Sequence, residues 1–110
     1  MSPTTQALDI SAEVAGIHAA AYEREHEQVS TLLDEDLAVC VVRIEPSPAE
    51  QLLVTNHHGD AVHDQRQAFE HTLAPAMTAA VERATGRAVT AFHTDTHLES
   101  NVTVLIFMLG

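Results

Sequence analysis

The sequence contains no lysine, and all five of its basic residues are arginine. Without lysine the chain cannot form a Schiff base, attach pyridoxal phosphate or supply the lysine of a nucleotide-binding P-loop. The four glycines lie far apart, at positions 16, 59, 86 and 110, so no glycine-rich phosphate cradle or dinucleotide fingerprint is present. Composition alone therefore excludes several covalent and nucleotide-dependent chemistries, and we expect no cofactor.

Cysteine and long apolar runs are also scarce. The single cysteine, Cys40, lies inside the run LAVCVV and is predicted to be a small buried hydrophobe, because apolar surroundings raise the pKa of a thiol. No apolar run reaches the roughly 18 residues needed to span a bilayer. The N-terminus MSPTTQALD lacks the basic-then-apolar order of a secretory signal. We expect a cytoplasmic protein without direct membrane insertion.

The chain also has few positively charged residues. Sixteen acidic residues face the five arginines, which gives a formal net charge of -11 with the histidines neutral. Such a surface repels phosphate backbones and anionic lipid, and no basic stripe compensates locally. Nucleic acid is therefore not an expected partner.

The length and apolar content of the chain predict one folded domain. The chain has 110 residues and is 45% apolar, so a flexible leader over residues 1–8 and a single domain over residues 9–110 are expected. Apolar spacing predicts an amphipathic helix over residues 9–25 and a long helix from Val62 to Ala84, kinked at Pro75 and ended by Gly86. The run DLAVCVVRIE predicts a strand over residues 36–45, and Pro48 begins a short helix.

Two further strands are predicted for RAVTAF and NVTVLIFML near the C-terminus. A right-handed crossover makes the first two of the three strands parallel, and the most apolar strand belongs in the middle. The predicted fold is thus α+β, with a three-stranded mixed sheet of order 1-3-2, a split β-α-β arrangement, and helices on one face.

The stretch HTDTHLE, residues 93–99, is the main candidate site. In an extended strand His93, Asp95 and His97 point to the same side, and a bend in the chain would let two imidazoles and a carboxylate share a zinc ion. The same residue types are typical of a solvated turn, in which Asp95 bonds neighbouring amides. We favour the metal-free turn, and a metal site or a ligand contact remains the alternative.

Other polar residues carry weaker signals. His57, His58 and His63 cluster near the start of the long helix and are expected to face solvent, while His18 and His71 are expected at the boundary of the core. HEQVS lacks the second histidine of a zinc-protease motif, and no serine lies in a nucleophile elbow. An enzyme is not expected.

The order of these segments resembles the MpsC-like family, named for a component of a sodium-translocating, membrane-potential-generating system. The resemblance runs from about residue 10 to the C-terminus and rests on three motifs: LLDEDLAVCVVRIEPSPAEQLLV, a long helix carrying proline and ending in ATGRAV, and FHTDTHLESNVTVLIFML. It implies a peripheral accessory role beside a membrane ion-transport or inorganic-carbon uptake system. It implies no catalytic residues.

The function predicted from these observations is association, with a second copy of the chain and with a membrane transport protein. Both faces of the terminal strand are apolar, so two helices on one sheet face would leave the other face exposed. We therefore predict a homodimer or higher oligomer. Helices on opposite faces would instead complete a monomer, and a metal- or small-molecule-responsive domain using residues 93–99 is the alternative function. The predicted interface residues are Leu105, Phe107, Leu109, Val39 and Val41.

Overall fold

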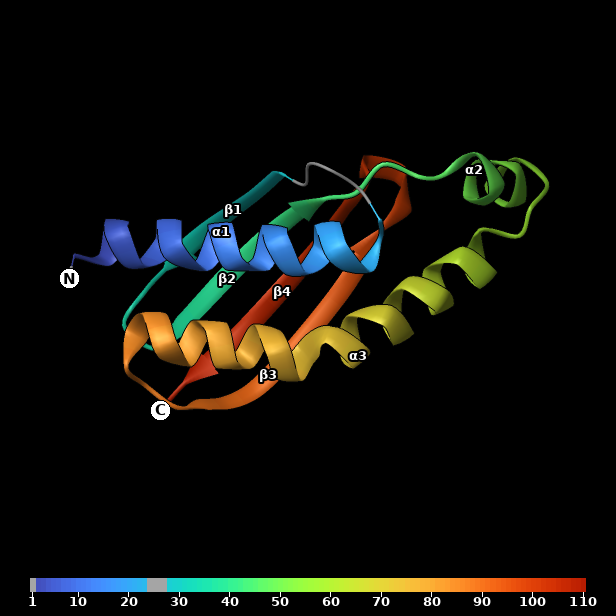
Figure 1. Ribbon diagram of the computed structural model, residues 1–110. Helices are drawn as coiled ribbons and strands as arrows, with labels where there is room; N and C mark the ends of the chain where they lie inside the picture. The colour runs from blue at the N-terminus through green and yellow to red at the C-terminus, as the bar shows by residue number, and fades with distance from the viewer. Residues whose placement is uncertain (1, 24–27) are drawn as a thin grey trace.

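The computed structural model describes residues 2–23 and 28–110, and the α+β class is confirmed for this part of the chain (Figure 1). Three α-helices, a 3-10 turn and four strands occur in it. In chain order they are α1 (Pro3–Ala21), β1 (Gln28–Leu33), β2 (Leu37–Arg43), α2 (Pro48–Thr55), α3 (Gly59–Thr85), β3 (Val89–His97), η1 (Leu98–Ser100) and β4 (Val102–Leu109).

The sheet has the order β1-β2-β4-β3, and every neighbouring pair is antiparallel. The predicted three-stranded mixed sheet is therefore wrong. The three predicted strands keep the relative order that was expected, but a fourth strand, β1, pairs with the outer edge of β2. Strands β2 and β3 do run in the same direction, yet β4 lies between them, so no parallel pair is formed.

The element order repeats once, because a helix followed by a hairpin occurs as α1-β1-β2 and again as α3-β3-β4. The two hairpins meet along the antiparallel pair β2 and β4, with Cys40 opposite Leu105 near its centre. An approximate twofold axis through this pair would produce such an arrangement. Helix α1 packs on β1, α3 packs on β3, and the two helices pack against each other.

Helices α1 and α2 begin in the same way, with a serine N-cap followed by proline. Ser2 accepts a hydrogen bond from the backbone N–H of Thr5, and Ser47 forms a full capping box with Glu50. Because α1 begins at Pro3, most of the predicted leader of residues 1–8 is helical. The predicted end of this helix, at residue 25, falls among residues 24–27, which lie outside the described part.

Helix α3 is continuous through Pro75, as predicted, and changes direction near its middle (Figure 1). It ends at Gly86, whose φ of 69° lies in the left-handed region, where a residue without Cβ carries no steric cost. Helix α2 lies beyond the sheet (Figure 1), whereas His63 and Gln67 in the N-terminal half of α3 contact β3.

Both α1 and α3 lie on the same face of the sheet (Figure 1). The side chains of β2 and β4 that point toward them are buried, whereas their alternate neighbours are only partly buried. The core between the two layers consists of Ile10, Val14, Ala38, Cys40, Val42, Ile44, Met77, Val81, Leu105, Phe107 and Leu109.

The predicted turn over residues 93–99 is corrected by the structure. Strand β3 continues through His97, so residues 93–97 pair with β4, and the turn is confined to η1 and Asn101. Asn101 adopts a left-handed conformation with φ of 54°, which asparagine tolerates better than most residues. The polar residues of this stretch therefore lie on an edge strand, where alternate side chains face solvent.

Candidate functional site

The sheet face opposite the helices is a largely apolar surface, which we call the open face. Its side chains lie in rows across the sheet, because the strand register places Leu32 beside Val39, Val39 beside Ile106, and Ile106 beside His93. Leu32 is 71% exposed. The central strands contribute Leu37, Val39, Val41, Val102, Val104, Ile106 and Met108, all partly buried.

Charge is nearly absent from the open face. Among the strand residues on it that the structure describes, Asp95 is the one acidic residue and Arg43 the one basic residue. The whole chain carries sixteen acids, and among those that the structure describes Asp95 is the one at a strand position of this face. A neutral apolar face on a strongly acidic protein is the place where a second molecule meets the least repulsion.

The predicted interface residues divide between the two sheet faces. Leu105, Phe107 and Leu109 point toward the helices and are buried within one chain, so they belong to its core and present no surface. Val39 and Val41 point the other way and lie on the open face. The sequence could not separate these groups, because both sides of β4 are apolar.

The residues predicted as weak metal ligands lie at the rim of the open face. His97 Nε2 lies 3.1 Å from Asp95 Oδ2, and His63 Nε2, from α3, lies 3.8 Å from Asp95 Oδ1. His93 is exposed on the same side of β3. Asp95 thus contacts His97 through one carboxylate oxygen and His63 through the other. Among the described residues, no three His, Cys, Asp or Glu side chains are grouped to hold a metal ion.

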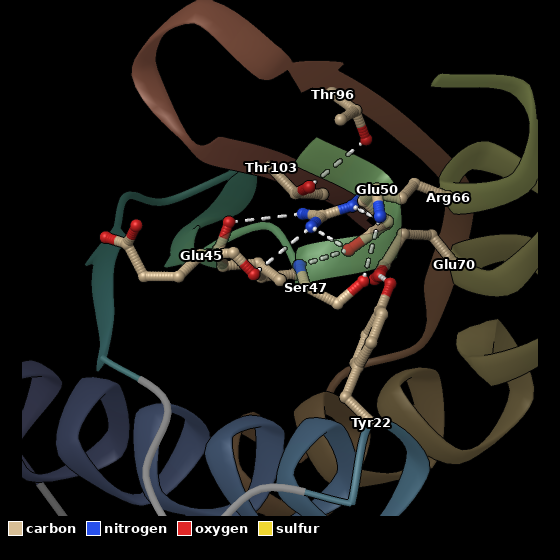
Figure 2. A network of polar contacts seen from close by, with 9 residues as sticks. Tyr22, Glu45, Ser47, Glu50, Arg66, Glu70, Thr96 and Thr103 are labelled. Atoms are coloured by element: carbon tan, nitrogen blue, oxygen red, sulfur yellow. Dashed lines mark hydrogen bonds and ion pairs between the residues drawn. The ribbon is translucent and has the colours of Figure 1, made fainter. Parts of the chain in front are cut away.

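A buried polar network lies on the helix-covered side of the sheet, where α2 and α3 meet the end of β2 (Figure 2). Arg66 is almost fully buried and donates from Nε and Nη2 to the two oxygens of Glu50, both at 2.9 Å. It also donates to the backbone carbonyls of Ile44 and Glu45. The hydrogen bonds from Arg66 are the main cause that lowers the pKa of Glu50 to about 2.

Glu70 is the second centre of this network, and its carboxylate is completely buried. His18 Nε2 lies 2.6 Å from Glu70 Oε1, and the Tyr22 hydroxyl donates to Oε2 at 3.1 Å. Burial, with a further contribution from the Glu70 charge, raises the pKa of Tyr22 well above its usual range. The Tyr22 ring stacks on Phe69 with 4.8 Å between centroids. Tyr22 also lines a hollow of about 280 Å³ beside Glu50 and Arg66.

The sequence predicted His18 only at the boundary of the core, and no prediction was made for Glu70, whereas both are fully buried. Both continue helical stripes at four-residue spacing, since Ile10 and Val14 precede His18, and Val62 and Arg66 precede Glu70. The spacing was therefore a usable signal. His71, also predicted at the core boundary, is exposed and contacts Phe92 edge-on.

Helix α2 has no buried residue, and its apolar side chains point outward. Leu52 is 65% exposed, Leu53 is 38% exposed and Val54 is 43% exposed. Its position depends on the Ser47 cap and the Glu50–Arg66 pair more than on apolar packing.

The family model described as Na+-translocating membrane potential-generating system (MpsC) matches residues 5–110, which is essentially the whole chain. Comparison with curated proteins and with solved structures gives no significant match. In the part of the chain that the structure describes, no helix is long and apolar enough to cross a membrane.

Proposed function

This chain belongs to the MpsC family, and we propose that it is a non-enzymatic association module that acts as an accessory to a membrane ion-transport system. The open face carries this proposal. An apolar surface on two central strands, with one acidic residue in a chain of net charge -11, fits a protein contact better than a charged or catalytic role.

We infer that the first occupant of the open face is a second copy of the chain. Strand spacing of about 4.8 Å and a rise of about 3.4 Å per residue give the sheet a footprint of roughly 450 Å² per copy. That area is at the lower limit for a specific interface, so a dimer in the micromolar range is expected rather than an obligate one. A basic partner would be attracted to the acidic surfaces instead, because the open face offers it almost no opposite charge.

A non-enzymatic role is supported by the buried ionisable side chains, which are bonded to one another. Arg66 is paired with Glu50, and Glu70 is bonded to His18 and Tyr22, so these side chains satisfy one another within the fold. The alternative function, a metal- or small-molecule-responsive domain, has less support. Its candidate ligands His93, Asp95 and His97 lie on an edge strand, where the Asp95 carboxylate contacts His97 and, from α3, His63.

Light scattering tests self-association. The mass of the unmodified protein should rise from 11.9 kDa toward twice that value across the micromolar range. Val41→Glu, at the centre of the open face, should keep the mass at that of a monomer, because it places a charge in the contact. Leu52→Glu is the control, since Leu52 is exposed on α2, a helix that lies away from the sheet in Figure 1; it should associate like the wild type. A monomer mass for the wild type at all concentrations contradicts the dimer.

The accessory role is tested in a cell from which the gene has been deleted. Deletion should reduce the Na+-dependent part of the membrane potential, and the wild-type gene and Leu52→Glu should restore it while Val41→Glu should not. If the system serves inorganic-carbon uptake, deletion should instead make growth depend on raised CO2. Unchanged membrane potential together with unchanged growth in ordinary air contradicts both roles.

A further inference from the structure

The buried pair of His18 and Glu70 has a fixed arrangement of hydrogen-bond donors. His18 Nδ1 lies 2.9 Å from the carbonyl oxygen of Val14. A carbonyl oxygen only accepts, so Nδ1 must carry a hydrogen. The other ring nitrogen, Nε2, lies 2.6 Å from Glu70 Oε1. If Nε2 were bare and Glu70 ionised, two lone pairs would face each other at this distance with no exposure to water.

We propose that His18 and Glu70 form a buried proton-binding site, in which one proton lies in the bond between Nε2 and Oε1 and joins α1 to α3. The proton is shared either as imidazolium with carboxylate or as imidazole with carboxylic acid. Both forms give the pair no net charge. Removing the proton would leave an unpaired anion in a site that both side chains occupy at 0% exposure, which is costly in a low-dielectric interior.

The groups around the pair supply hydrogen bonds and one ion pair. From α1, the Tyr22 hydroxyl donates to the second oxygen of Glu70 at 3.1 Å. From α3, the Arg66 guanidinium lies 6.0 Å from the centre of the Tyr22 ring, but its charge is engaged by Glu50 of α2. Arg66 and Glu50 therefore cancel, and Arg66 does not balance an ionised Glu70.

If the folded chain keeps the proton shared by His18 and Glu70, its stability against unfolding must fall as pH rises. An exposed histidine in the unfolded chain loses its proton near pH 6.5. Above that pH the folded chain holds one proton more than the unfolded chain, so the unfolding constant should rise about tenfold per pH unit. Below it, down to the range where carboxylates titrate, both states hold the proton and the pair makes no contribution to the slope.

Glu70→Gln isolates this effect, because the amide keeps both hydrogen bonds without the proton. Its N–H donates to the bare Nε2 of His18, and its oxygen accepts from Tyr22. In this variant the unfolded chain gains a proton below pH 6.5 and the folded chain does not, so the variant is destabilised on the acidic side instead. The ratio of the wild-type to the variant unfolding constant should rise about tenfold per pH unit, or roughly a thousandfold from pH 5 to pH 8.

Urea unfolding of both chains at intervals between pH 5 and pH 8 measures this ratio. Tyr22→Phe is the matched control, because it removes a hydrogen bond to the same carboxylate but keeps the proton. It should be less stable at every pH and retain the wild-type slope. A ratio between wild type and Glu70→Gln that does not change with pH would overturn the proposal.

A second measurement is independent of any variant and remains available if Glu70→Gln does not fold. NMR of the wild type labelled with 15N and 13C reports protonation of both His18 ring nitrogens and of the Glu70 carboxyl. Between pH 6 and pH 8 we expect a hydrogen on Nδ1 and one further proton on either Nε2 or the carboxyl. A bare Nε2 beside an ionised carboxyl at neutral pH would overturn the proposal.

Discussion

Glu50 is the residue that fixes the position of α2. It accepts hydrogen bonds from Arg66 and from the backbone of Ser47, and α2 has no buried side chain of its own. The folded pKa of Glu50 is about 2, below the unfolded value of 4.5, and the largest cause is the hydrogen bonding by Arg66. Because the folded pKa is depressed, this stabilisation is present above pH 4.5 and is lost as pH falls toward 2.

We predict that the wild type loses about 2 to 3 kcal/mol more stability between pH 5 and pH 2.5 than the Glu50→Gln variant does. The variant should already be less stable at pH 7, because a buried guanidinium keeps only a neutral partner. Urea unfolding at these pH values measures both effects. Glu45→Gln, at the exposed neighbouring acid, should follow the wild type. Parallel acid losses in wild type and Glu50→Gln would contradict the assignment.

Cys40 is buried as the sequence predicted, and burial raises the pKa of its thiol to about 11, with a small opposing effect from the Thr31 hydroxyl. We predict that a thiol reagent labels the native protein at pH 8 more slowly than the urea-unfolded chain by a factor on the order of 10³ or more, because labelling requires opening. A native rate within tenfold of the unfolded rate would contradict this. Because the folded pKa is raised, stability should also fall as pH rises from about 9 through 11.

Periodicity in the sequence predicts the burial of some single residues and not of others. Apolar periodicity located Cys40 and the helical stripes, because burial follows spacing. It placed His18 only at the boundary of the core and did not identify Glu70 as buried, since an isolated polar residue is usually expected at or near the surface. Two polar residues that continue apolar stripes on different helices can bury each other, and only the packing of α1 on α3 reveals that they meet.

Elements with strong end signals were the ones that the sequence located well. Gly86 ends α3, and Ser47 with Pro48 begins α2. Strand β1 was missed although Val29, Thr31 and Leu33 alternate with more exposed residues. An edge strand of six residues has weak periodicity, and it follows a highly charged stretch. The stretch 93–97 has turn-like composition, yet pairing with β4 keeps it extended.

The repeated helix and hairpin units could not be seen in the sequence either. The two units share an arrangement of elements, but the first is followed by α2 before the second begins. Pairing between β2 and β4 is what joins them, and such contacts depend on strands distant in the chain. Local spacing therefore predicts the elements better than it predicts their pairing.

The capping serines allow a test at the scale of one helix. Ser47→Ala should remove about 1 kcal/mol of capping stabilisation from α2. Because α2 has no buried residue, this loss should open α2 locally, and amide hydrogen exchange in residues 48–55 should become faster while β2 and β4 stay protected. Ser2→Ala is the matched control, which should affect only the first turn of α1. Faster exchange throughout the sheet after Ser47→Ala would contradict a local role.

At the scale of the whole molecule, charge and apolar surface are separated. The formal charge of -11 makes two copies repel at long range, while the open face carries almost none of that charge. The sequence predicted both an acidic surface and a sheet with two apolar sides. The sequence left open whether α1 and α3 cover the same face of the sheet. Their placement depends on how β1 and β3 extend the sheet on either side of β2 and β4.

This separation predicts how self-association responds to salt. Repulsion between the acidic surfaces acts over about a Debye length, which falls from about 30 Å at 0.01 M salt to about 8 Å at 0.15 M. Apolar contact on the open face is not weakened by this screening. The dimer should therefore become tighter as salt rises over that range at pH 7.5, and sedimentation equilibrium at fixed protein concentration measures the change. Val41→Glu should stay monomeric at both salt concentrations. If the wild-type dimer instead dissociates as salt rises, its contact depends on ion pairs between the two copies, formed by charged residues such as Asp95 and Arg43, and the apolar open face is not what holds it together.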